Sequence, residues 1–357
     1  DDFKRKEAWV EVTGDVDTGI TEIQNVGATE LKALPAGSLY PDWARSSFTS
    51  IAKGLGSGAH GIVDYEGQER VIETDEDAAG DLVFTPVVQE TAETGSGNDV
   101  LRFFRGADVG DWLHKLFEAR FNAKSEEEID DVVNGIPGRL KRALFMQGKT
   151  EEEFVAVEEL VANMLDSVVN SDVLPATDDF SAFQFNALAS ESRTNEMPFL
   201  LSVKNRRLTT PVLLETLKKV GLELEGDAVT RLTGYLTGAI DMVMFAQGKY
   251  WVVDWKSNFI GDGTAQSYSQ EEMEKEIDRK HYRLQYVIYL LALKRHLISV
   301  AGVPKEEVWD HIAGAMYVFL RGVDADQTIN ENGKRNGIFI DCPREAVDAL
   351  DKLLEGN

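Results

Sequence analysis

The chain has 357 residues, 43% of them hydrophobic, which is enough for one large or two ordinary domains with a buried core. No apolar run approaches the ~18 residues of a membrane span, so no membrane partner is expected. The single cysteine, Cys342, excludes an internal disulfide framework and a zinc or iron–sulfur site built from several cysteines. A reducing, cytoplasmic setting is consistent with this cysteine content.

The net charge of −25 argues against a free-standing nucleic-acid binder, because such proteins bind phosphates largely through basic side chains. Two interpretations remain open. The acidic side chains serve solubility, or a polyanionic substrate is delivered to this chain by something else.

Residues 1–98 are predicted to be a connector from a preceding domain, flexible in part. The chain begins Asp-Asp-Phe, without a starter Met or a signal-peptide pattern, so we expect a piece of a longer protein. Gly56, Gly58 and Gly61 have the GxGxxG spacing of dinucleotide sites, but no helical pattern follows them. A flexible linker is the better interpretation of this stretch.

Residues 99–357 are predicted to form one ordered domain. Apolar residues at helical spacing predict an amphipathic helix over 108–122, which carries His114. Residues 123–175 are expected to be a helical subdomain, since capping-box patterns begin at Ser125 and Thr150. The further predicted elements are a strand at 196–203, a short helix at 211–220, a buried strand at 313–320, a short strand at 337–341 and a helix at 344–354.

Two β-rich runs on either side of Gln247-Gly248 predict a tight hairpin over residues 235–256. With a loop of two or four residues Asp241 lies directly opposite Asp254, whereas a loop of three breaks this register. Lys256 is two residues beyond Asp254 and therefore shares its face. Like charges at opposed positions are destabilising, and a divalent cation held by oxygen ligands would relieve that repulsion.

A long helix is predicted from about residue 270 to 297. It places Tyr282, Gln285 and Tyr289 on one face, at the spacing i, i+3, i+7. Taken by itself this pattern is typical of a half-polar packing stripe. Trp251 and Trp255 alternate away from Asp254 along the strand, so their side chains are expected to pack in the core.

An Asp on one strand, followed on the next by Asp-x-Lys, is the sequence form of the PD-(D/E)XK nuclease site. Alone, the pattern is common and more often a surface ion pair. The chemistry is nevertheless coherent, because phosphodiester hydrolysis needs a metal that activates water and neutralises charge on the phosphate. Two carboxylates supply the metal site, and a nearby lysine orients or deprotonates the water and stabilises the transition state.

The surroundings of this pattern resemble the C-terminal nuclease domain of the RecB family. The resemblance runs from about residue 46 to the C-terminus and is dense in five blocks: GDWLHKLFE (110–118), SRTNEMPF (192–199), GAIDMVMFAQGKYWVVDWKSN (238–258), HYRLQYVIYLLAL (281–293) and YVFLRGVD (317–324). It implies an α/β fold of the restriction-endonuclease type, with a central mixed sheet flanked by helices and an N-terminal helical portion.

Position by position, the resemblance implies that Mg²⁺ is bound by His114, Asp241 and Asp254 and by the backbone carbonyl of Trp255. Lys256 would be the catalytic lysine. Without the resemblance, a single His on an amphipathic helix is usually a boundary residue whose hydrogen bonds are satisfied within the fold.

Glu196 is implied as a further acidic contributor, although Met197-Pro198 follows it. Gln285 and Tyr289 match a family motif after the catalytic strand, and they would position DNA or the lysine.

The resemblance implies a Mg²⁺-dependent exo- or endodeoxyribonuclease that cuts strands fed to it by a helicase. By this resemblance it would be the nuclease module of a RecBCD-type complex in bacterial double-strand-break repair and recombination. The implied partners are DNA, RecC-like and RecD-like subunits and RecA, and ATP would be needed only by the helicase part absent from this chain. The alternatives are a non-catalytic docking module for RecA or the companion subunits, and a PD-(D/E)XK nuclease outside recombination.

Overall fold

The computed structural model describes residues 45–46, 48, 51, 60–63, 69–72, 107–122, 162–224, 226, 229–263, 265–323 and 333–356. They belong to one compact unit that begins at Asp42. The helices predicted to start at Ser125 and Thr150 lie outside the described residues, apart from a helical stretch at 162–170. Within the described ranges no helix has both the length and the apolar character needed to cross a bilayer.

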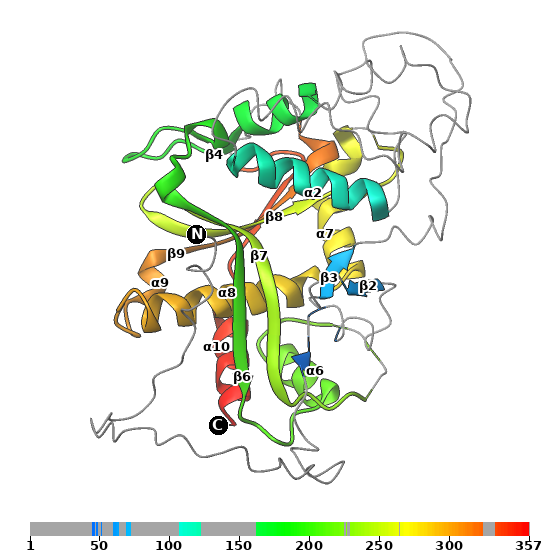
Figure 1. Cartoon of the computed structure of the whole chain (residues 1–357), viewed down its shortest axis with the longest axis vertical. Coiled ribbons are helices and arrows are strands. Elements are labelled where there is room, and N and C mark those ends of the chain that lie inside the picture. The colour runs from blue at the N-terminus through cyan, green and yellow to red at the C-terminus, as the bar shows by residue number, and fades with distance from the viewer. Residues whose placement is uncertain are drawn as a thin grey trace, which may run out of the picture. The chain divides into compact units, whose positions relative to one another are not determined.

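A six-stranded mixed sheet forms the centre of the fold and confirms the predicted α/β architecture (Figure 1). Its strands are β1 (Arg45–Ser46), β7 (Gly234–Ala246), β8 (Lys249–Lys256), β9 (Ile312–Phe319) and β10 (Ile338–Asp341) in spatial order, with β6 (Arg193–Val203) also paired to β7. The β6/β7, β7/β8 and β9/β10 pairs are antiparallel, whereas β1/β7 and β8/β9 are parallel.

The hairpin between β7 and β8 forms as predicted, around Gln247 and Gly248. Both residues have positive φ, 50° and 75°, as a two-residue type I′ turn requires. Gln247 is not a residue that favours this conformation, but its side-chain amide donates to the carbonyls of Pro175 and Ser181 at 2.9 Å. These bonds tie the turn to a neighbouring loop and help to offset its backbone cost.

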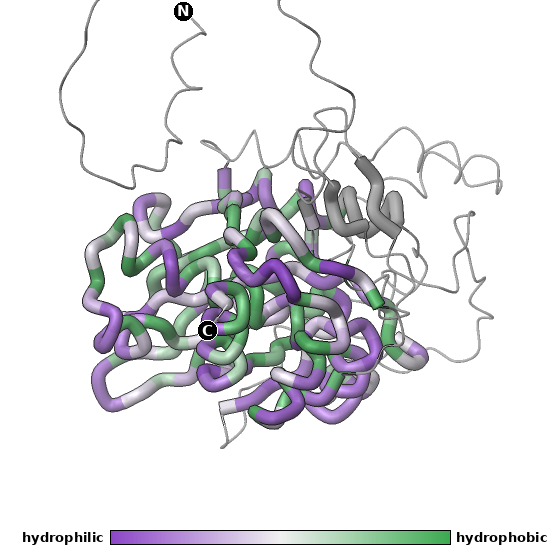
Figure 2. The backbone as a smooth tube through the Cα atoms, turned by 90° about the horizontal axis from the view of Figure 1, so that it is seen from below, coloured by the Kyte–Doolittle hydropathy of each residue, from purple (hydrophilic) through white to green (hydrophobic). Residues whose placement is uncertain are grey.

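Helices cover both faces of the sheet. One face packs against α2 (Ala107–Asn122) and the helical stretch 162–170. The other packs against α7 (Gln270–Arg279), α8 (Tyr282–Ser299) and α10 (Arg344–Glu355), together with α6 (Thr210–Lys218). Figure 2 shows the apolar segments gathered toward the middle of the described fold and the hydrophilic ones around it.

The remaining elements are short. They are α9 (Val308–His311), the 3-10 turns η3 (Phe185–Ala187), η4 (Ser190–Ser192), η5 (Ala265–Tyr268) and η6 (Leu320–Gly322), and two small antiparallel pairs, β2 (His60–Val63) with β3 (Glu69–Ile72) and β4 (Asp172–Leu174) with β5 (Phe183–Gln184).

Part of the segment predicted as a connector contributes to this core. β1 pairs with β7, and Phe48 and Ile51 are buried in the same hydrophobic cluster as α8.

The single helix predicted over 270–297 is wrong, because the chain breaks between α7 and α8. His281 has φ 57°, a left-handed conformation that costs a non-glycine residue about 1–2 kcal/mol. Neither glycine nor proline marks the break in the sequence. Instead the break is held by tertiary contacts, since the Asn258 amide donates to Glu276 of α7 and to the Tyr282 hydroxyl of α8.

Candidate active site

Asp241 lies where the β7/β8 ladder stops. The predicted register is confirmed over the pairs from Ala246–Lys249 to Met242–Val253. The next step would pair Asp241 with Asp254, but the ladder ends before it, so the predicted direct pairing is not formed. The reason is that the Asp241 carboxylate itself accepts the Trp255 backbone N–H at 3.0 Å, a donor that the ladder would otherwise have used.

Near Asp241, the alternate side chains of both β6 and β7 switch from one side of the sheet to the other. Leu236 and Ile240 of β7 pack with α8, whereas Met242 packs with α2, although all three residue numbers are even and strict alternation would keep them together. On β6 the change falls at Glu196, whose φ is 48°. In the β6/β7 register Glu196 is opposite Asp241. These two residues do not form a ladder pair, although the pairs on either side of them do.

His114 reaches the Asp241 carboxylate from α2, with Nδ1 at 3.3 Å from Oδ2. Their side chains are 30% and 16% exposed. Burial alone would raise the pKa of Asp241. The charge and hydrogen bond of His114, the Trp255 N–H and the charge of Lys256 outweigh burial, and they hold that pKa below its ordinary value. Asp241 is thus an anionic carboxylate with an imidazole beside it.

Asp254 and Lys256 form a buried ion pair on the face toward α8. The Lys256 ammonium is 2.6 Å from Asp254 Oδ2, and the two side chains are 1% and 3% exposed. A buried charge of either sign is costly unless a partner neutralises it, so each residue stabilises the other here. The predicted placement of Lys256 on the same face as Asp254 is confirmed.

Gln285 of α8 is the second polar partner of the lysine. Its Oε1 accepts from Lys256 Nζ at 3.0 Å and from the Tyr317 hydroxyl at 2.8 Å, while its Nε2 donates to the Tyr289 hydroxyl at 3.1 Å. The predicted Gln285 and Tyr289 therefore lie in one buried network with Lys256, and the packing-stripe interpretation of their spacing is insufficient.

Trp255 packs as predicted in the core on the α2 side, and Trp251 is packed against the same cluster. The Trp255 ring is stacked on Phe121, with centroids 5.7 Å apart, and also contacts Phe117 and Phe185. This anchoring fixes the backbone between Asp254 and Lys256, which includes the carbonyl that the resemblance assigns to the metal.

Together the residues form two neighbouring groups, His114 with Asp241 and Asp254 with Lys256 and Gln285. Among the described residues, no three His, Cys, Asp or Glu side chains converge closely enough to hold a metal ion. The chemistry of the donors fits a divalent cation nonetheless, because it offers carboxylate oxygens and one imidazole. Binding by both aspartates would require the Asp254 carboxylate to share or leave its contact with Lys256.

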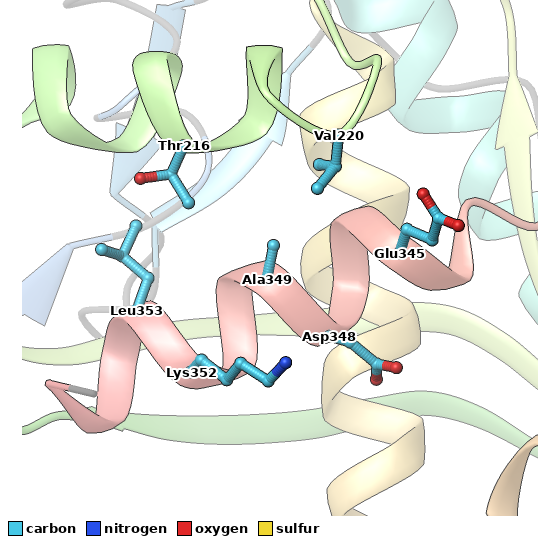
Figure 3. A pocket seen from close by; sticks show the side chains of 7 residues that line it. All are labelled: Thr216, Val220, Glu345, Asp348, Ala349, Lys352 and Leu353. Carbon is cyan, nitrogen blue, oxygen red and sulfur yellow. The ribbon is translucent and has the colours of Figure 1, made fainter.

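A pocket of about 480 Å³ between α6 and α10 is separate from this site (Figure 3). Its lining residues are Thr216, Val220, Glu345, Asp348, Ala349, Lys352 and Leu353. None of the predicted site residues is among them.

The profile of the PD-(D/E)XK nuclease superfamily matches residues 99–355. The chain belongs to this superfamily. It is similar to the RecBCD enzyme subunit RecB of Haemophilus influenzae (30% identity over 325 residues, 88% of this chain and 24% of that protein) and of Escherichia coli (26% over 340 residues, 94% and 25%). A shorter match, to RecB of Mycobacterium tuberculosis, has 35% identity over 128 residues, 35% of this chain and 11% of that protein.

These matches confirm the predicted resemblance to the RecB nuclease domain. The chain spans about a quarter of the length of the two RecB proteins that it matches over most of its own residues.

Three residues of this candidate site were not predicted as functional. The rings of Tyr282 and Tyr317 lie over the Lys256 ammonium, and Asn258 bonds the Tyr282 hydroxyl. Tyr282 was interpreted as a packing residue. Its position one helical turn before Gln285, on the same face, was the signal that could have indicated a role in the site. Tyr317 begins the YVFLRGVD block, but its place beside Asp254 could not be predicted, since it depends on the parallel β8/β9 register.

Proposed function

We propose that this domain hydrolyses phosphodiester bonds of DNA in a Mg²⁺-dependent reaction, at the site formed by His114, Asp241, Asp254 and Lys256. The observation that carries the proposal is the buried Asp254–Lys256 pair beside the anionic Asp241. Asp254 and Lys256 are the Asp-x-Lys of the motif, and in a superfamily of nucleases this is the part on which chemistry depends.

The proposed roles follow from the charges. Asp241, Asp254, His114 and the Trp255 carbonyl would hold the cation. When bound, a divalent cation lowers the pKa of a water molecule and neutralises charge on the phosphate.

Lys256 supplies a fixed positive charge beside the carboxylates, where negative charge develops on the phosphate. Gln285 holds this ammonium through a bond that does not involve Asp254. Glu196 adds a carboxylate on the strand next to Asp241. The Tyr289 hydroxyl, on the same helix as Gln285, accepts a hydrogen bond from the Gln285 amide.

We further propose that DNA strands are delivered by a helicase within a RecBCD-type assembly, with RecC-like and RecD-like subunits as partners and RecA as a client. The name of these relatives, RecBCD enzyme subunit RecB, supports this proposal. Tethering also makes the net charge of −25 intelligible, because linkage to a DNA-bound motor supplies a high local substrate concentration without affinity from the nuclease itself.

The test is release of acid-soluble nucleotides from linear DNA by the chain with Mg²⁺, with EDTA and after Asp254→Asn. We expect weak cleavage with Mg²⁺, none with EDTA, and a loss of activity in the variant. The matched control is Asp310→Asn, which changes an exposed aspartate outside the site. Activity should fall steeply as salt rises.

Unchanged cleavage in Asp254→Asn would contradict the assignment of the site. Tight, salt-tolerant DNA binding without cleavage would favour a docking module instead. Product lengths from end-blocked and circular DNA decide between exonuclease and endonuclease action.

A further inference from the structure

We propose that Tyr282 is a positioning residue that holds the Lys256 ammonium against the face of its ring. The inference rests on the proposed function, because it concerns the lysine of that site. Lys256 Nζ lies 3.9 Å from the centroid of the Tyr282 ring and 4.8 Å from that of Tyr317. Both distances are within the ~6 Å over which a cation is attracted by an aromatic face.

The two rings are stacked on each other, and both lie close to the ammonium. Their centroids are 5.7 Å apart and their planes differ by 16°. Lys256, Tyr282 and Tyr317 are all buried. Because water is excluded, the attraction between the cation and the rings is stronger than it would be at the surface.

The Tyr282 ring is itself held by the segment that directly follows the lysine. Asn258 follows Lys256 by two residues, and its amide donates to the Tyr282 hydroxyl at 3.0 Å and to Glu276 at 2.9 Å. The break at His281 makes Tyr282 the first residue of α8. The ring therefore cannot shift relative to Lys256 without also breaking the Asn258 bonds.

The rings matter because Asp254 is expected both to neutralise Lys256 and to bind the cation. In this structure its carboxylate neutralises Lys256. If that carboxylate binds a cation, Lys256 loses part of its counter-charge while it stays buried. The contacts to Tyr282, Tyr317 and Gln285 do not depend on Asp254, and they would keep the ammonium in place.

The first test weakens the ring's negative face without changing its shape. The reference protein is the Tyr282→Phe variant. Phenylalanines with one, two and three ring fluorines are then incorporated at position 282 and compared with it. We expect kcat to fall stepwise, by about tenfold in total, with KM little changed. The same series at Tyr250, whose ring packs on Phe245, is the matched control and should leave kcat unchanged. A flat series at 282, or an equal fall at 250, would overturn the proposal.

The second test needs neither metal nor DNA. In NMR spectra of protein labelled with ¹³C-lysine, the Lys256 ε-CH₂ protons should be shifted upfield by the two rings, with the signal assigned by its absence in Lys256→Arg. Tyr282→Leu should move that signal downfield, while Tyr282→Phe should not.

A signal that stays in place in Tyr282→Leu would contradict the contact even in an active enzyme. If the signal moves as expected in Tyr282→Leu but the wild-type chain does not cleave DNA, the contact is present and only the proposed function is contradicted.

Discussion

The backbone N–H of Trp255 donates to the carboxylate of Asp241, at the point where the β7/β8 ladder ends. In a hairpin with a two-residue loop, the hydrogen-bonded pairs alternate outward from Ala246–Lys249, and the next pair after Met242–Val253 would be Ile240–Trp255. The Asp241 side chain thus replaces the expected carbonyl of Ile240. The regular pairing of the two strands therefore ends at Met242–Val253, and the carboxylate takes the position of a backbone acceptor.

Two substitutions of Asp241 should separate its structural role from its chemical one. Asp241→Asn keeps an oxygen that accepts from Trp255 but removes the charge, so we expect nuclease activity to fall on the order of 100-fold or more. Stability should fall modestly, because the lowered pKa of Asp241 means that its charge stabilises the fold. Asp241→Ala also leaves the Trp255 N–H without this acceptor and should lose about 1 kcal/mol more in the free energy of unfolding. Urea denaturation and nucleotide release measure the two effects. Equal stability of the variants would argue against the structural role.

Glu196 should tolerate glycine better than alanine. Its φ of 48° favours glycine, and neither substitute retains a carboxylate, so the comparison isolates the backbone. We expect Glu196→Gly to be more stable than Glu196→Ala by about 1 kcal/mol in urea denaturation. Both variants should lose the same fraction of nuclease activity. A difference in activity would mean that the shape of β6 at this residue, and not only its carboxylate, contributes to cleavage.

Substitution of Gln285 should lower stability and kcat more than substitution of Tyr317. Gln285→Met removes an acceptor that serves both Lys256 and Tyr317 in a buried site, and we expect a loss of about 1–3 kcal/mol in stability and a marked fall in kcat. Tyr317→Phe, the matched control, removes only the hydroxyl and keeps the ring over Lys256. It should lose about 1 kcal/mol and remain active. If Gln285→Met keeps wild-type kcat, the amide does not position the lysine.

Much of the fold could be predicted because the signals were local. The turn at Gln247-Gly248, the alternation along β8 and the amphipathic α2 each depend on neighbouring residues. The register over the hairpin followed from its loop length, and this placed Asp241 and Asp254 on adjacent strands.

What could not be predicted depends on contacts between distant segments. The left-handed residues Glu196 and His281 carry no glycine or proline signal, and tertiary packing imposes both. The parallel register that sets Tyr317 beside Asp254 has no turn to define it. A direct pair between Asp241 and Asp254 was expected from the loop length, but the Trp255 N–H donates to the Asp241 carboxylate and the ladder ends there.

Asp351 of α10 should make stability depend on acid pH. Burial alone would raise the pKa of this carboxyl, but hydrogen bonds and charges from Lys294 and Arg295 outweigh burial and hold it below its ordinary value. The Asp351 carboxylate oxygens lie 2.7 Å from Lys294 Nζ and 2.7 Å from a guanidinium nitrogen of Arg295. The Lys294 side chain is only 5% exposed. Lys294 also pairs with Asp348, so the loss of Asp351 leaves it with one remaining carboxylate.

A carboxyl whose pKa is depressed on folding stabilises the protein above its unfolded pKa of about 3.9, and that contribution disappears as pH falls through the folded pKa. Asp351→Asn should therefore lower the free energy of unfolding by about 1–2 kcal/mol at pH 7. The difference from the wild type should be complete above about pH 5 and shrink below about pH 4. Urea denaturation from pH 7 to pH 3 measures it, with Asp310→Asn as the exposed control. A difference that stays constant over this range would mean that Asp351 acts through packing and not through its charge.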